Sequence, residues 1–339
     1  MRMLLQEADI NCIVQKHLSI HMADLAIGID IGGTNTKFGV VDRNGHILEQ
    51  GRTLTNDRST AQDFIEDLYD KIQPMIERAG GKDKFAGIGI GAPNGNYYTG
   101  NIEYAANLKW QGIIPFASMM STRFDMRVKL TNDANAAAMG EMMYGAARGM
   151  KHFITITLGT GVGSGIVIDG KIVLGHDGFA GELGHTIIRP GGRLHKGTGI
   201  HGPLEAYASA TGMRETALEM LSTKPETPST MRELKPEEIT SQSVYEAALK
   251  GDAVAQEVFA FTGQLLGEAL ANFIMFSSPE AIVLFGGVTK AGDMILNPTR
   301  KAMEANLVQV FKNKVKLMFS ELKEADAAIL GASALIWEA

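Results

Sequence analysis

Two short glycine-rich stretches, each directly after an apolar run, carry residues suited to phosphate chemistry. The first comprises Asp30, Gly32, Gly33, Thr34 and Asn35, and the second comprises Gly159, Thr160 and Gly161. Glycine turns after buried strands let backbone N–H groups approach phosphate oxygens without interference from Cβ atoms. Asp30 adds a carboxylate that could hold a phosphate-bound Mg²⁺ through water. The alternative for the first stretch is a structural hairpin with a capping aspartate.

A third polar cluster, Asn132-Asp133-Ala134-Asn135, lies where a short apolar run meets an alanine-rich segment. High helix propensity after the cluster predicts a strand-to-helix junction. Capping of the helix would explain one such residue, because Asn and Asp side chains accept hydrogen bonds from free N–H groups of the first turn. One cap needs only one residue, so the crowding leaves room for a second role, and both roles can share the junction.

The composition restricts the class of protein. The chain has 339 residues, enough for two domains, with 45% hydrophobic residues, 21% charged residues and a net charge of −6. The acidic balance argues against a nucleic-acid surface, and we expect no membrane span because there is no apolar run of about 18 residues. The single cysteine, Cys12, excludes an intrachain disulfide framework and fits a cytoplasmic protein.

The two glycine stretches belong to a repeated pattern that must position them. Each pattern is an apolar strand, a glycine turn, a second strand and a hairpin turn, which is Asn44-Gly45 in the first copy and Asp169-Gly170 in the second. Neither glycine stretch ends in Gly-Lys-Ser/Thr, and neither opens a helix, so a P-loop and a dinucleotide fingerprint are excluded. Two copies about one domain length apart predict a duplicated architecture.

Helices and strands alternate around these hairpins, which predicts an α/β fold. Residues 60–79 have apolar positions at intervals of four and predict a helix, whereas Phe85 to Asn94 predicts a buried strand that ends in a turn. A further apolar strand from Ala281 ends on Gly286 and Gly287. Residues 222–242 are rich in Pro, Ser, Thr and Glu, and we expect a polar surface excursion there.

On these motifs the chain resembles the ROK group of sugar kinases and repressors. The resemblance is carried by GIDIGGTNTK at 28–37, GIGAPN at 89–94, NLKW at 107–110, LTNDANAAAMGE at 130–141, LGTGVGSG at 158–165, GELGH at 181–185, LEAYASATG at 204–212 and LFGGV at 284–288. It implies a two-lobed actin-like ATPase (ribonuclease H-like) fold with duplicated mixed β-sheet domains flanked by helices. We expect an N-terminal extension at 1–22, a small lobe at 23–131 plus 325–339, and a large lobe at 132–324.

The resemblance also implies roles for individual residues. Asp133 corresponds to the general base that takes a proton from the sugar hydroxyl. The sugar contacts correspond to Asn107, Asn132, Glu182, His185 and Glu205. The second glycine turn would hold the β- and γ-phosphates, with Gly286 and Gly287 near the adenosine. The alternatives are a structural histidine at 185, a carboxylate that complements a helix dipole at 205, and close strand–helix packing at 286 and 287.

One departure from the family pattern concerns zinc. Many members carry three cysteines before the Leu-Glu pair, with the Gly-His histidine as the fourth ligand. The corresponding positions here are Lys196, Thr198 and Pro203, none of which supplies a thiolate. We therefore predict no structural zinc, and a loop at 191–202 that is either more mobile or differently built.

The resulting expectation is a cytoplasmic, homodimeric, ATP- and Mg²⁺-dependent hexose kinase that converts glucose to glucose 6-phosphate. Fructose, mannose, allose or an N-acetylhexosamine are alternative substrates, because epimer discrimination depends on hydroxyl geometry that a sequence does not display. A sugar-responsive transcriptional repressor is a further alternative. Repressors of this group carry a helix-turn-helix region before the first glycine turn, and the residues that precede it here are few and not basic.

Overall fold

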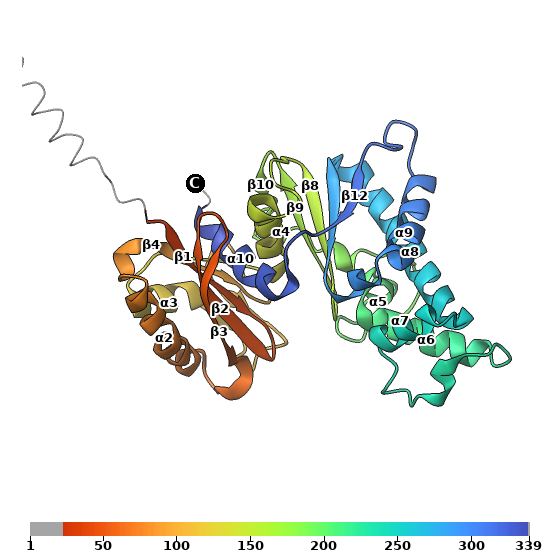
Figure 1. The fold of residues 1–339 in the computed structure, drawn as a ribbon, viewed down its shortest axis with the longest axis horizontal. Coiled ribbons are helices and arrows are strands. Elements are labelled where there is room, and N and C mark those ends of the chain that lie inside the picture. Colours follow the sequence, from red (N-terminus) through yellow and green to blue (C-terminus); the bar gives the residue numbers. More distant parts are fainter. Residues whose placement is uncertain (1–22, 338–339) are drawn as a thin grey trace, which may run out of the picture.

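The structure is a computed structural model that describes residues 23–337, so the expected extension at 1–22 and the last two residues of the expected small lobe lie outside it. Two five-stranded sheets stand side by side with helices around them (Figure 1). The first has the order β3-β2-β1-β4-β7 and the second the order β10-β9-β8-β11-β12. In each sheet the first three strands are antiparallel and the last three are parallel. The predicted duplication of mixed sheets is confirmed.

The strands of the first sheet are β1 (Leu25–Ile31), β2 (Asn35–Asp42), β3 (Ile47–Leu54), β4 (Phe85–Gly91) and β7 (Val128–Thr131). Those of the second sheet are β8 (Phe153–Leu158), β9 (Val162–Ile168), β10 (Lys171–Ile172), β11 (Ala281–Phe285) and β12 (Lys316–Phe319). A small third sheet pairs β5 (Ile102–Glu103) with β6 (Ile113–Ile114). The hairpin signal at 169–170 is confirmed, since Asp169 and Gly170 have φ values of 52° and 73°, as a two-residue turn of type I′ requires.

Alternation of isoleucine and glycine along β1 and β4 gives the first sheet two different faces. The isoleucines pack with helices α2 (Ala61–Arg78) and α3 (Phe116–Phe124) in one hydrophobic core. The glycines lie under helix α10 (Glu324–Trp337). A Cβ on Gly28 would lie only 2.1 Å from the carbonyl oxygen of Ile329, so this face accepts the helix only because it is bare.

Helix α4 (Asp133–Tyr144) lies between α10 and the second sheet, which makes a layer order of sheet, α10, α4, sheet. The two helices meet at a close contact, because a Cβ on Gly331 would lie 2.6 Å from the carbonyl oxygen of Ala136. On its other side α4 packs on β8 and β9. The helix that begins with Asp133 is therefore held by both halves of the molecule.

The outer face of the second sheet is covered by helices α8 (Ala253–Ser277) and α9 (Asp293–Ala305), and α5 (Glu205–Ala208), α6 (Ala210–Thr223) and α7 (Ser241–Leu249) extend that layer. Short 3₁₀ turns occur at Thr55–Asp57, Lys82–Lys84, Leu183–His185, Thr230–Glu233 and Gly287–Ala291. Within the described residues α8 is the one helix long and apolar enough to cross a membrane, yet 67% of its apolar window is buried inside the protein. That burial is typical of a core helix.

The polar segment at 222–242 differs from the expectation of a purely surface excursion. Met231 and Ile239 are buried in the core of the second half, with exposed fractions of 1% and 2%. Two apolar side chains spaced eight positions apart are enough to pin a polar segment to that core, since each loses its contact with water. The division into separable lobes at positions 131 and 324 stays a prediction.

Candidate functional site

The carboxyl ends of three parallel strands bring the first polar groups together. Asp30 on β1 is in register with Gly91 on β4, and Gly91 is in register with Thr131 on β7. A Cβ on Gly91 would lie 3.8 Å from Asp30 Oδ1 and 3.6 Å from the Cα atom of Asp133. The glycine therefore leaves open the space beside both aspartates.

Asn132 and Asp133 share the junction in the way the sequence suggested. The side chain of Asn132 is the N-cap of α4, because its Oδ1 accepts a hydrogen bond of 2.7 Å from the Asn135 backbone N–H. Asp133 Oδ1 accepts a bond of 2.9 Å from the N–H of Ala134. The Asn132 amide keeps its N–H₂ donors for another partner, so capping and a binding role are compatible in one residue.

The carboxyl groups of this region carry raised pKa values. Asp133 is exposed to solvent, and the many protein atoms around it still raise its pKa. Burial, followed by the negative charge of Asp133, raises the pKa of Asp30 to about 6, while Lys37 opposes the shift. Lys37 is the register partner of Asp30 across β1 and β2. We regard Lys37 as a residue of the site that the sequence alone did not assign.

The first glycine turn is fixed by a residue from another loop. The Asn56 side-chain amide donates to the Gly33 carbonyl oxygen and, at 3.2 Å, to the carbonyl oxygen of Asn107. Asn56 Oδ1 also accepts a bond of 3.1 Å from the N–H of Lys109. Asn107 is exposed beside the turn, and Thr34 and Asn35 are exposed at its tip. Asn56 was missed at the sequence level because nothing near it in the chain marks it.

The second glycine turn is fixed by helices α5 and α6. The carbonyl oxygen of Gly159 accepts from the N–H of Ala210 at 2.8 Å, and that of Thr160 accepts from the Thr211 hydroxyl at 3.0 Å. Immediately after Gly161, the N–H of Val162 donates to Glu205 Oε2 at 2.6 Å. Glu205 therefore reaches the second glycine turn itself.

Two predicted carboxylates influence the pKa of a third in this region. Burial raises the pKa of Glu182, His185 opposes the shift, and the charges of Asp133 and Glu205 add to it. The ring of His185 places Nε2 3.8 Å from Glu182 Oε2, while its Nδ1 is buried without a hydrogen-bond partner. The pKa of Glu182 thus responds to Asp133, which lies 49 positions earlier in the chain, and to Glu205, which lies 23 positions later.

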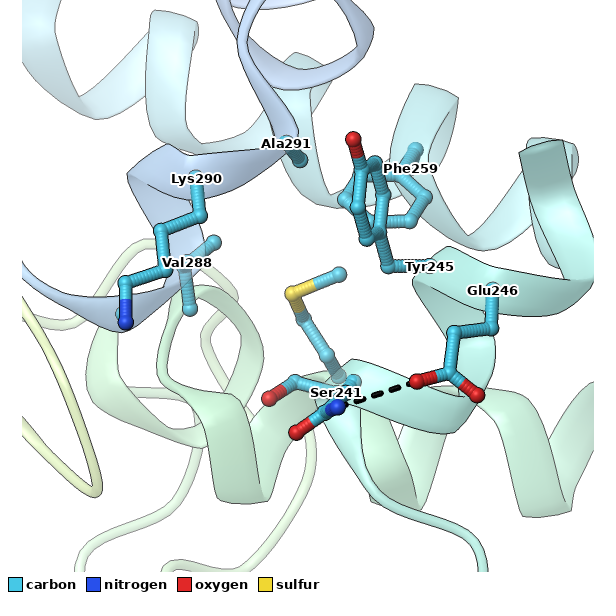
Figure 2. A pocket seen from close by; sticks show the side chains of 10 residues that line it. Ser241, Tyr245, Glu246, Phe259, Val288, Lys290 and Ala291 are labelled. Atoms are coloured by element: carbon cyan, nitrogen blue, oxygen red, sulfur yellow. Dashed lines mark hydrogen bonds between the residues drawn. The ribbon is translucent and has the colours of Figure 1, made fainter.

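A cavity of about 390 Å³ lies beside Gly287 on the outer side of the second half (Figure 2). The side chains around it include Tyr245, Phe259, Val288 and Lys290. Gly286 has φ 108° and its Cβ would lie 2.6 Å from the Leu158 carbonyl oxygen, so close packing accounts for that glycine. No neighbouring atom lies within 4 Å of a Cβ on Gly287, and packing does not account for it. An apolar cavity with aromatic walls suits a planar ring.

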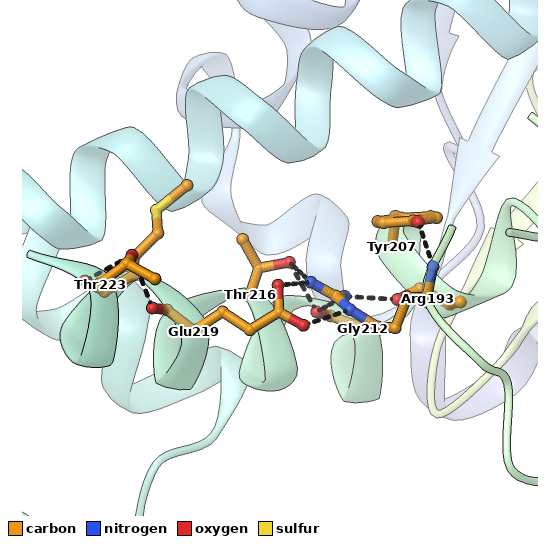
Figure 3. Close-up of polar contacts among 8 residues, drawn as sticks. Arg193, Tyr207, Gly212, Thr216, Glu219 and Thr223 are labelled. Atoms are coloured by element: carbon orange, nitrogen blue, oxygen red, sulfur yellow. Dashed lines mark hydrogen bonds and ion pairs between the residues drawn. The ribbon is translucent and has the colours of Figure 1, made fainter. Parts of the chain in front are cut away.

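The loop at 191–202 is held in place by hydrogen bonds of Arg193, and the expectation that it is either more mobile or differently built stays a prediction. Arg193 holds it to helix α6 through bonds to the Gly212 carbonyl oxygen at 3.0 Å, the Thr216 hydroxyl at 3.0 Å and Glu219 Oε2 at 2.7 Å (Figure 3). Lys196, Thr198 and Pro203 lie in or beside this loop. Among residues 23–337 no three His, Cys, Asp or Glu side chains form a metal-binding group. The absence of zinc stays a prediction for elemental analysis.

The chain is similar to known proteins over most of its length. Residues 26–339 match the ROK family. The chain belongs to the ROK family. It is 34% identical to a glucokinase of Halalkalibacterium halodurans, over 91% of this chain and 94% of that protein. It is 32% identical to a glucokinase of Thermotoga maritima, over 92% of this chain and 97% of that protein.

Solved structures agree on the fold. A ROK family glucokinase from Streptomyces griseus, in complex with glucose and AMPPNP, superposes with a TM-score of 0.76 at 32% identity, over 92% of this chain and 98% of that chain. The fold is thus the actin-like fold of ROK sugar kinases. Repressors occur among the relatives too. The xylose repressor of Caldicellulosiruptor bescii is 28% identical over 91% of this chain and 77% of its own length.

Proposed function

We propose that this ROK protein is an ATP-dependent hexose kinase, with glucose as the first substrate to test and glucose 6-phosphate as the product. The observation that carries the proposal is the position of Asp133, an exposed carboxylate with a raised pKa, beside Asp30 at the ends of the parallel strands. A raised pKa makes a carboxylate a stronger base. The identity to two glucokinases supports glucose over other hexoses.

In the proposed reaction the Asp133 carboxylate accepts the proton of the attacking sugar hydroxyl. The hydroxyl oxygen forms a bond to the γ-phosphorus of ATP, the bond from γ-phosphorus to the β,γ-bridging oxygen breaks, and ADP leaves. Backbone N–H groups of the two glycine turns hold the phosphates. We assign the sugar hydroxyls to Asn107, Asn132, Glu182, His185 and Glu205, and the adenosine to the cavity beside Gly287.

The carboxylates present fit a divalent cation. Asp30 has a pKa of about 6 because it is buried near the negative charge of Asp133, and Lys37 offsets that charge only in part. Mg²⁺ held by Asp30 through water would neutralise charge on the phosphates. The fit rests on excess negative charge where a cation-bound triphosphate would be placed.

An ADP-release assay across a hexose panel tests the proposal. The panel comprises glucose, fructose, mannose, allose and N-acetylhexosamines, with Asp133→Asn as the inactive control. We expect ADP formation that depends on glucose, ATP and Mg²⁺. Turnover with another hexose would correct the substrate, and no turnover with any hexose would contradict the kinase.

We further propose a cytoplasmic homodimer that does not bind DNA. Phe276 and Ile187, exposed to 84% and 58%, flank an apolar cavity of about 380 Å³, which supports self-association through this face. Sedimentation of the wild type and of the Phe276→Glu variant tests the dimer.

The glucokinase of Halalkalibacterium halodurans is more similar to this chain than the xylose repressor is, at 34% and 28% identity. A DNA-shift assay tests the absence of DNA binding.

A further inference from the structure

One close contact between a histidine of the loop at 191–202 and a carboxylate has no role in the proposed function. His195 Nε2 lies 2.9 Å from Glu205 Oε1, and the two side chains are only 22% and 14% exposed. His195 Nδ1 lies 2.9 Å from the hydroxyl of Thr198. This pattern suits an imidazole whose Nε2–H donates to the carboxylate while Nδ1 accepts from the threonine.

Glu205 is held at both of its oxygens. Oε2 accepts from the N–H of Val162 at 2.6 Å, and Oε1 lies 2.9 Å from His195 Nε2. Each carboxylate oxygen keeps a second lone pair, so the group can still accept from a substrate hydroxyl. The carboxylate is also very close to the phosphate turn, since a Cβ on Gly161 would lie 2.4 Å from Oε2.

This position has an electrostatic cost. A carboxylate beside a turn that binds phosphate repels the anion it must adjoin, and the repulsion is larger where water is partly excluded. A partner on the far oxygen fixes the side chain in one rotamer. His195 is placed to do this.

We propose that His195 is the positioning residue that holds Glu205 between the sugar and the phosphate turn. The inference rests on the proposed function, since it concerns a sugar contact of that site. His195 is itself held, because its loop closes through the bond of 2.8 Å from its N–H to the Ile200 carbonyl oxygen. The Arg193 network anchors the same loop to α6 (Figure 3). The ring of His195 lies 6.2 Å from that of His185, so it also borders a second predicted sugar contact.

The test compares three variants by steady-state kinetics with the sugar and with ATP. His195→Leu removes the donor, and His195→Gln keeps an amide N–H that can reach Glu205. His201→Ala is the matched control, because the ring of this exposed histidine of the same loop bonds to the Gly192 carbonyl oxygen, at 3.0 Å, and not to Glu205. We expect His195→Leu to raise KM for the hexose about 10- to 100-fold, the loss typical of a hydrogen bond to a charged group.

The split between substrates separates positioning from general damage. KM for ATP should change less than about 3-fold, His195→Gln should recover most of the hexose KM, and His201→Ala should match the wild type. Equal losses for both substrates, or no recovery in His195→Gln, would overturn the inference. If the leucine variant does not fold, His195→Asn replaces it, because its shorter amide does not reach Glu205.

Failure of the proposed function gives a different result. A wild-type protein that phosphorylates no hexose contradicts the kinase and the inference together. A wild type that phosphorylates a hexose while His195→Leu keeps the wild-type hexose KM contradicts the inference alone.

Discussion

Asp30 and the first residue of α4, Asp133, lie on either side of the space that a side chain on Gly91 would fill. The charge of Asp133 contributes to the raised pKa of Asp30, which is about 6. Two carboxylates at the ends of neighbouring parallel strands store unfavourable charge in the protein without ligands. A cation and a proton transfer would each relieve it.

The role of Asp133 as a base is tested by Asp133→Asn. The amide keeps the size of the side chain and cannot accept the proton, so kcat should fall about 10²- to 10⁴-fold, the usual contribution of a general base. Sugar binding, measured by calorimetry, should stay within about 3-fold because the other contacts remain. Turnover close to the wild-type rate would assign the base elsewhere.

Activity should rise with pH through the acid range. Desolvation by the surrounding protein atoms raises the pKa of Asp133, so its base form is lost at a higher pH than for an ordinary aspartate as the pH falls. Asp30 loses its charge near pH 6 in the same direction. More Mg²⁺ favours the ionised carboxylates, so the acid limb of kcat/KM should move to lower pH as the magnesium concentration rises. An acid limb whose position does not change with the magnesium concentration would show that Asp30 does not hold the metal.

The ionised carboxylate of Asp30 should lower the free energy of unfolding in metal-free buffer. Its pKa of about 6 when folded exceeds the ordinary value of 3.8, so the folded state holds the proton more tightly. The contribution of the protonated Asp30 to the free energy of unfolding is fully present below pH 3.8 and is lost as the pH rises through 6. The loss is at most about 3 kcal/mol. Asp30→Asn should therefore raise the free energy of unfolding by about 1–3 kcal/mol at pH 8 and change it little at pH 4. Urea titrations at both pH values measure this, and equal effects would refute the charge explanation.

Asn56 should matter to both substrates. It ties the Gly33 turn to the loop of Asn107, so Asn56→Ala frees the proposed phosphate-binding turn and the proposed sugar-binding loop together. We expect KM for ATP and for the hexose to rise about 10-fold each, the loss of one to two hydrogen bonds. Asn56→Asp keeps the acceptor for the N–H of Lys109 and loses the donor to Gly33, so it should behave like alanine. A wild-type KM for either substrate in both variants would show that the two loops keep their positions without the hydrogen bonds of Asn56.

The contact between α4 and α10 should tolerate no side chain. Gly331→Ala would place a Cβ 2.6 Å from the Ala136 carbonyl oxygen, so the helices must move apart. Overpacking of this kind costs about 1–3 kcal/mol, and Gly331→Val should cost more. Chemical unfolding measures both, and an unchanged midpoint for valine would mean that the helices separate freely.

Local patterns were sufficient for the fold and for part of the site. Strand, glycine turn and hairpin are short-range signals, and they placed Asp30 and Gly159 at strand ends where the structure has them. Asn132 was foreseen as a possible cap because capping is set within one turn of helix. Such signals need no knowledge of distant residues.

Residues that act through distant partners were not predictable. Asn56 meets Asn107 across 51 positions, and His195 meets Glu205 only because a loop closes on itself. The hairpin of β1 and β2, which sets Lys37 opposite Asp30, could be predicted from the sequence. The face of the first sheet that lies toward the second half of the molecule could not be predicted. The polar segment at 222–242 was expected to lie wholly on the surface, because its average composition hid Met231 and Ile239.

The glycine face of the first sheet has a consequence for synthesis of the protein. Gly28 is covered by Ile329, which leaves the ribosome 301 residues later, since 329 − 28 = 301. At roughly 5–20 residues per second the uncovered sheet waits about 15–60 seconds for its helix. The first half of the nascent chain therefore spends that time with a flat, bare β surface open to other chains, and it becomes a finished unit only when the last helix arrives.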